Sequence, residues 1–170
     1  MSELSPEVAA VLEKLPCDEY ATAEKLFEQL LAGGPDAIRQ LVVAVGPKFG
    51  DGDGVKPKYA VHGLTVYAAR PGADGQRRVV AGALAKELGA KHSDELKAFV
   101  CRQLQLCGTA GEVPALAGLL ESDRLCEPAA QALQAIGGDA ALKTLRGAQA
   151  KADGDRKRTL DQAVEFVSNQ

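Results

Sequence analysis

The stretch EVPALAGLLESDRLCEPAAQALQAI, residues 112–136, decides the fold of this chain. Each half carries apolar side chains at the spacing of one face of an amphipathic helix. The two faces consist of Val113, Leu116, Leu119 and Leu120, and of Ala129, Ala130, Leu133 and Ile136. Helices this short cannot bury such faces alone, because isolated short helices are marginal in water. The stretch therefore predicts one unit of a stacked helical array.

The composition indicates an all-α fold and a single domain. The chain has 170 residues, of which 46% are hydrophobic and only 4% are aromatic, and it contains no Trp. Its apolar residues are mainly Ala, Leu and Val, which suit closely packed helices better than a sheet rich in aromatic and β-branched residues. We expect one domain over residues 1–170, with a divergent helix pair at 1–34 and more regular pairs over 35–170.

Proline and glycine divide the chain into ten expected helices joined by short turns. The expected ranges are 5–15, 22–32, 35–45, 56–69, 75–88, 93–107, 112–121, 125–136, 139–150 and 154–167. Ser93 and Asp139 are expected N-caps, since their side-chain oxygens can accept from first-turn amides. The segment KFGDGDG, residues 48–54, is expected to be a surface turn. A calcium loop is the alternative there, but the segment lacks the distal Glu of an EF-hand.

An imperfect repeat runs through the second helix of each later pair. Aligning these helices on a central apolar residue superposes Leu64, Leu104, Leu133 and Val164, at separations of 40, 29 and 31 residues. Two helices per period of about 30 to 40 residues are typical of a helical solenoid. Leu104 and Leu133 are therefore predicted to lie in the core.

The segment PALAGLLESDRLCEPAAQALQAIGGDAALKTL, residues 114–145, resembles a HEAT-type repeat. The likeness lies in a Leu-rich first helix, an acidic turn at Glu121 to Asp123, and a second helix of small residues that ends in Ile-Gly-Gly. The chain is also similar to the HEAT-rich proteins of some environmental bacteria. The resemblance implies a right-handed α-α superhelix of about five antiparallel helix pairs. It also implies a non-catalytic scaffold that binds a protein or peptide on its concave face and carries no cofactor and no metal.

Polar side chains occupy equivalent positions on these second helices, spaced i, i+3. Stacking is expected to join them into one polar ribbon on the concave side of the array. The alternative is an ordinary solvated face, although such a face more often uses Glu and Lys. The predicted partner-binding residues are His62, Thr65, Arg102, Gln105, Gln131, Gln134, Gln162 and Glu165.

Two other functional readings remain open at the sequence level. One is an enzyme or enzyme subunit on the same scaffold, since HEAT-like folds include tetrapyrrole lyases and a glycosylase family for alkylated bases. The glycosylase comparison fails, because such proteins need a cationic groove and aromatic side chains, whereas this chain has a net charge of −3 and no Trp. The other reading is a segment of a longer scaffold. No nucleic-acid partner is expected.

The cysteines, the histidines and the basic cluster are predicted to have structural and not catalytic roles. Cys17, Cys101, Cys107 and Cys126 show no CxxC pair and no adjacent His, so buried free thiols are expected, with a disulfide such as Cys107 to Cys126 as the alternative. His62 and His92 lack a recognisable nucleophile in sequence, and no catalytic residue is assigned. The basic cluster Arg156, Lys157 and Arg158 is interleaved with Asp residues and is expected to be a solvated helix start.

The chain shows no feature of membrane insertion. No run of 18 apolar residues exists. The N-terminal segment carries acidic residues where a secretory signal carries basic ones. A cytoplasmic location is the default expectation, and an extracytoplasmic one stays open if a signal peptide has been removed.

Overall fold

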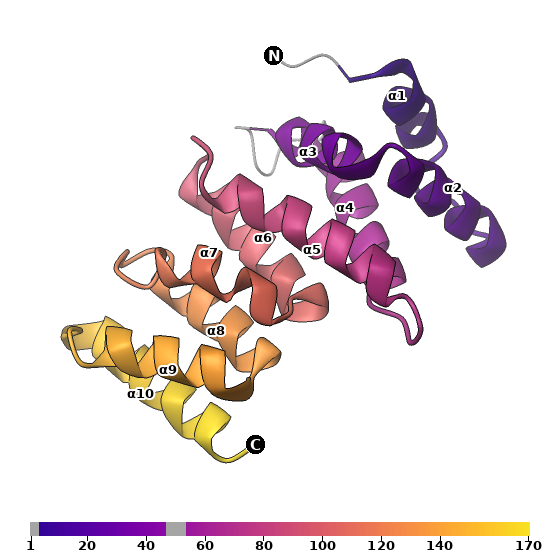
Figure 1. Cartoon of the computed structure of the whole chain (residues 1–170). Coiled ribbons are helices and arrows are strands. Elements are labelled where there is room, and N and C mark those ends of the chain that lie inside the picture. Colours follow the sequence, from indigo (N-terminus) through magenta and orange to yellow (C-terminus); the bar gives the residue numbers. More distant parts are fainter. Residues whose placement is uncertain (1–3, 47–53) are drawn as a thin grey trace.

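The computed structural model describes residues 4–46 and 54–170, which form ten α-helices and a short 3₁₀ turn (Figure 1). The described residues contain no strand. The predicted surface turn at 48–54 falls, apart from Gly54, outside the described residues. The elements are α1 (Pro6–Glu13), α2 (Tyr20–Ala32), α3 (Gly34–Val45), α4 (Val55–Ala68), α5 (Asp74–Leu88), α6 (Asp94–Cys107), η2 (Ala110–Glu112), α7 (Val113–Ala117), α8 (Cys126–Ile136), α9 (Gly138–Gln149) and α10 (Gly154–Ser168).

The helices pack in two layers that follow the order of the chain. The even-numbered helices contact one another in succession from α2 to α10, and the odd-numbered helices do so from α1 to α9. In Figure 1 the helices α5, α7 and α9 lie in front of α6, α8 and α10. We call the outer sides of the two layers the even-helix face and the odd-helix face. The predicted all-α superhelical fold is confirmed.

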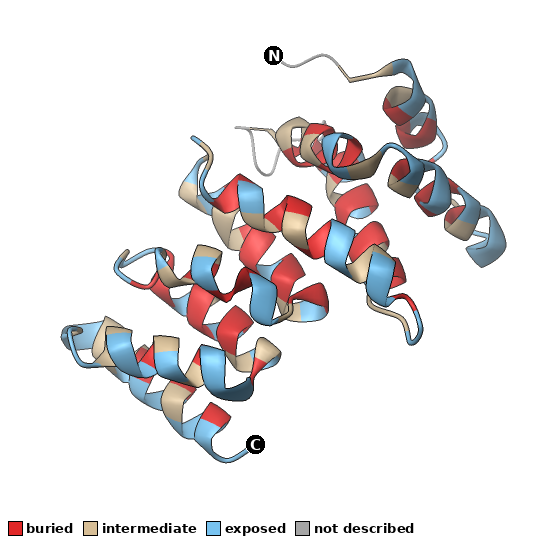
Figure 2. Ribbon diagram, in the orientation of Figure 1, coloured by how far each residue is buried: buried red, intermediate tan, exposed pale blue. Residues whose placement is uncertain are grey.

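The core lies between the two layers and extends along the whole stack. One buried apolar cluster runs from Val8 to Val167, and Figure 2 shows the buried residues along the facing sides of the helices. Leu104 and Leu133 are fully buried, as their place in the repeat predicts. Val164 is only partly buried, because α10 packs mainly against α8 and α9 and one of its sides stays uncovered.

Most helix ends lie within two residues of the predicted ones, but the cap of α9 and the end of α7 differ in ways that the backbone explains. Asp139 does not cap α9, because Gly137 and Gly138 both adopt positive φ angles (66° and 74°) and the helix begins at Gly138. The helix α7 ends at Ala117 instead of residue 121. From there the amides of Leu119 and Leu120 bond to carbonyls three residues back, which tightens the chain into successive turns. Ser93 caps α6 as predicted, with its hydroxyl accepting from the amide of Leu96.

Candidate binding surface

Four of the predicted ribbon residues are exposed, and each lies on a different even-numbered helix. His62, Arg102, Gln131 and Gln162 lie on α4, α6, α8 and α10 and are all exposed. Each of these helices contacts the next, so the four side chains are presented in sequence order. We call this set the polar row.

Side-chain contacts join neighbouring even helices near the polar row. The Nδ1 of His62 on α4 lies 3.1 Å from Oε1 of Gln103 on α6. On the next pair, Nε2 of Gln105 on α6 donates to Oε1 of Gln131 on α8 at 3.3 Å. The structure thus brings His62 beside α6 and joins Gln105 to the polar row. The contribution of Gln103, which is buried, was missed because its position within the helix pattern reads as core.

The remaining predicted residues divide into two groups. Gln105 and Gln134 are half-buried and Glu165 is exposed, so all three reach the surface. Thr65 does not. Its side chain is fully buried, and its Oγ1 donates to the carbonyl of Val61 at 2.8 Å. A short hydroxyl can satisfy itself within its own helix in this way, whereas a Gln or Glu side chain extends to solvent. Thr65 is therefore removed from the ribbon.

A second line of exposed residues accompanies the polar row and is apolar. The side chains of Val66, Leu106 and Phe166 are 51%, 42% and 54% exposed, and Ala135 between them is also exposed. Each lies four residues after a member of the polar row, hence one helical turn further along the same side of its helix. We call this set the apolar row. The sequence contains these residues at equivalent positions, but apolar side chains on a helix read as core.

Arg102 and the C-terminal basic cluster differ in whether acidic residues pair with them. Within the described residues, Arg102 makes no hydrogen bond and no ion pair. By contrast, the C-terminal basic cluster is neutralised: Arg156 contacts Asp123 at 3.1 Å and Asp153 at 3.3 Å. Lys157 pairs with Asp161 and Arg158 with Asp155. The cation of Arg102 is thus free to meet a partner.

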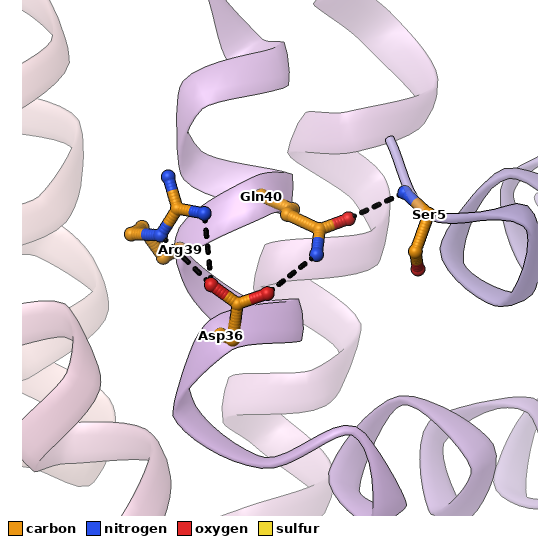
Figure 3. Close-up of polar contacts among 4 residues, drawn as sticks. All are labelled: Ser5, Asp36, Arg39 and Gln40. Atoms are coloured by element: carbon orange, nitrogen blue, oxygen red, sulfur yellow. Dashed lines mark hydrogen bonds and ion pairs between the residues drawn. The ribbon is translucent and has the colours of Figure 1, made fainter. Parts of the chain in front are cut away.

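A cleft of about 560 Å³ opens at the other end of the molecule between α1, α2 and the start of α3. Three of its lining residues are joined by hydrogen bonds (Figure 3): the amide nitrogen of Ser5 donates to Oε1 of Gln40 at 2.7 Å, and Nε2 of Gln40 donates to Oδ2 of Asp36 at 2.7 Å. Arg39 donates to Oδ1 of Asp36 through Nε and Nη2. These bonds from Arg39 and Gln40 lower the pKa of Asp36, so its carboxylate is ionised and already neutralised by a neighbour.

The cysteines are free thiols, and the alternative of a disulfide between Cys107 and Cys126 is wrong. Cys101, Cys107 and Cys126 are buried, whereas Cys17 is only partly covered. Burial raises the pKa of Cys101 and of Cys107 to about 12. Such thiols are protonated at neutral pH and make poor nucleophiles.

His92 forms a pair that the sequence did not reveal. Its Nε2 lies 2.7 Å from Oε2 of Glu87, which is buried. The neighbouring hydroxyl of Ser93 is engaged elsewhere, because it accepts from the amide of Leu96 and hydrogen-bonds the carboxyl of Glu95. Within residues 4–46 and 54–170, no group of three or more His, Cys, Asp or Glu side chains is placed to hold a metal ion. The same residues include no helix long and apolar enough to cross a bilayer.

Comparison with known proteins gives no family for this chain. No family model matches it. No curated protein matches it either. Its function therefore has to be inferred from its surfaces.

Proposed function

We propose that the protein is a non-catalytic scaffold that binds a protein or peptide segment on its even-helix face. The observation that supports this most directly is that the polar row and the apolar row are exposed at equivalent positions of α4, α6, α8 and α10. Folding does not require the apolar row, because the core lies on the opposite side of these helices. Apolar side chains left exposed in an ordered line favour an interaction site over a plain solvated face.

The two rows supply different parts of recognition. Val66, Leu106 and Phe166 offer apolar contact area, while Gln131 and Gln162 offer amides that both donate and accept hydrogen bonds. A HEAT-like array would curve this face inward, so one segment could meet several helices at once. With about 10 Å between neighbouring helix axes, four helices span about 30 Å. An extended segment of about nine residues has this length.

Arg102 is the residue expected to contribute most to affinity. It is exposed, it lies on α6 between α4 and α8, and it pairs with no acidic residue of the described chain. Its guanidinium offers five donors in a planar fork, and Arg is enriched among interface residues that dominate binding energy. We expect the partner to place a carboxylate or a group of backbone carbonyls against it.

Differential affinity capture from the source cell, followed by mass spectrometry, tests the proposal. The bait is used as wild type, as the Arg102→Ala, Leu106→Ala double variant, and as a control in which Arg156, Lys157 and Arg158 are all changed to Ala. A true partner is retained by the wild type and the control and lost by the double variant. For that partner, Arg102→Ala alone should weaken binding by about 2 kcal/mol in calorimetry. The opposite ranking of the two variants would remove the even-helix face from consideration.

A further inference from the structure

The cleft between α1, α2 and α3 has the dimensions of a small-molecule site. Its volume of about 560 Å³ lies within the range of about 300 to 1,000 Å³ that is usual for ligand pockets. The apolar part of its lining consists of Val8 and Ala10 from α1, Leu30 and Ala32 from α2, and Ala37 from α3. Each of the three helices contributes a short alanine side chain to this part.

Most polar groups at the cleft already have partners. Asp36 is held by Arg39 and Gln40, and Gln40 is bonded in turn to Ser5. Glu7 and Gln29 also line the cleft, and neither makes a hydrogen bond or ion pair within the described residues. Among the described residues, no Lys or Arg lines it. Of the two described carboxylates at the cleft, Asp36 is paired and Glu7 is not.

We propose that this cleft binds a small organic amine with an apolar body. The apolar part would lie against the exposed Ala10 and Ala32, above the buried Val8, Leu30 and Ala37, and the ammonium group would meet the exposed Glu7. An anion would be disfavoured there, since Glu7 is negative and no described residue that lines the cleft is a cation. A neutral apolar ligand would gain the wall contacts but would leave the carboxylate without a partner. The site lies at the far end of the array from α10 and is separate from the polar and apolar rows.

Fluorescence titration with two matched dyes tests this inference. Dansylcadaverine carries a primary amine on an alkyl chain, and dansyl-aminocaproic acid carries a carboxylate on a similar chain. The proposal predicts that the amine binds at least about fivefold more tightly than the acid, and that Glu7→Gln weakens the amine about fivefold, the upper range for an exposed ion pair. Added salt should reduce the difference, because the pair is exposed.

Steric variants locate the dye. Ala10 is exposed on α1 and lines the cleft, so Ala10→Phe should fill the space and weaken amine binding more than tenfold. Ala21→Phe, at an exposed position of α2 outside the cleft, is the matched control and should change nothing. Circular dichroism verifies that each variant is folded. If the Ala10→Phe variant does not fold, the change in amine affinity caused by Glu7→Gln tests the proposal.

Binding on the even-helix face is distinguished by a Leu106→Ala, Phe166→Ala double variant. Dye binding should be unchanged in it, whatever the outcome for the protein partner. Equal affinity for both dyes, no binding to the wild type at millimolar dye, or loss of binding in the double variant but not in Ala10→Phe would each overturn the proposal.

Discussion

The even-helix and odd-helix layers bury similar inner sides but expose different outer ones. Among the described residues, the exposed large hydrophobic side chains of the even helices are Tyr20, Val55, Tyr59, Val66, Leu106 and Phe166. On the odd helices only Val79 belongs to this class. The odd helices instead expose charges such as Arg78, Lys86 and Lys143. Both layers pack on one core, so the exposed apolar side chains of the even helices are not needed for the stability of the stack. They affect instead what the even-helix face contacts, which is solvent or a partner.

The largest expected effect separates the inner and outer sides of a single even helix. Leu133→Ala should lower the free energy of unfolding by about 2 to 5 kcal/mol, because it removes a fully buried side chain and leaves a cavity. Gln131→Ala, on the exposed side of α8, should change it by less than about 0.5 kcal/mol. Urea denaturation measures both. Equal midpoints would contradict the two-sided description of α8.

The second prediction concerns a bond between the layers. Arg77 on α5 donates through Nε to the carbonyl of Cys107 and through Nη2 to that of Gly108, both at 2.8 Å, and so satisfies the C-terminal end of α6. Arg77→Met should lower stability by about 1.5 to 3 kcal/mol, the range for hydrogen bonds from a charged donor.

Arg78→Met is the control for this prediction, because Arg78 is exposed and bonds only weakly to its own helix at 3.4 Å. Thermal unfolding of the two variants should give clearly different midpoints. A loss for Arg78→Met as large as that for Arg77→Met would show that the tie between the layers contributes little.

Substitutions at two glycines test how tightly the helices pack in the two layers. A Cβ added at Gly63 on α4 would lie 2.3 Å from Cζ of Phe27, whereas one added at Gly147 on α9 meets nothing within 4 Å. Gly63→Ala should therefore destabilise the protein by about 1 to 3 kcal/mol through overpacking. Gly147→Ala should stabilise it by about 0.5 to 1 kcal/mol through helix propensity. Calorimetric melting distinguishes the signs, and a gain at Gly63 would show that Phe27 moves aside easily.

The last prediction concerns the cysteines, and it is measured as a rate of reaction and not as a change in stability. A pKa of about 12 for Cys101 and Cys107 leaves roughly one thiol in ten thousand ionised at pH 8. In native protein at pH 8, a thiol reagent should modify the partly covered Cys17 first and the buried cysteines slowly. All four should react quickly in denaturant. Fast reaction of Cys101 in the native state would show that α6 opens readily.

Local signals in the sequence determined the helices and most of the core. Breakers mark helix ends through their own backbone properties, because Pro16 has a fixed φ and no amide hydrogen, whereas Gly34 adopts a positive φ of 62° that glycine tolerates. The 3.6-residue period identifies Leu104 and Leu133 as buried without reference to the rest of the chain. The exposure of His62, Arg102, Gln131 and Gln162 on successive even helices also follows from the repeat. These features depend on neighbours within a few turns or on equivalent positions in the repeat.

Only the tertiary structure decided which side of a helix is covered and how far. Periodicity shows that residues share a side, but coverage depends on where the neighbouring helices lie. For this reason Thr65 is buried although its equivalents reach solvent, and Phe166 is exposed although it is apolar. The pair of Glu87 with His92 and the cleft beside Ala10 arise in the same way, because each is built from segments that only packing brings together.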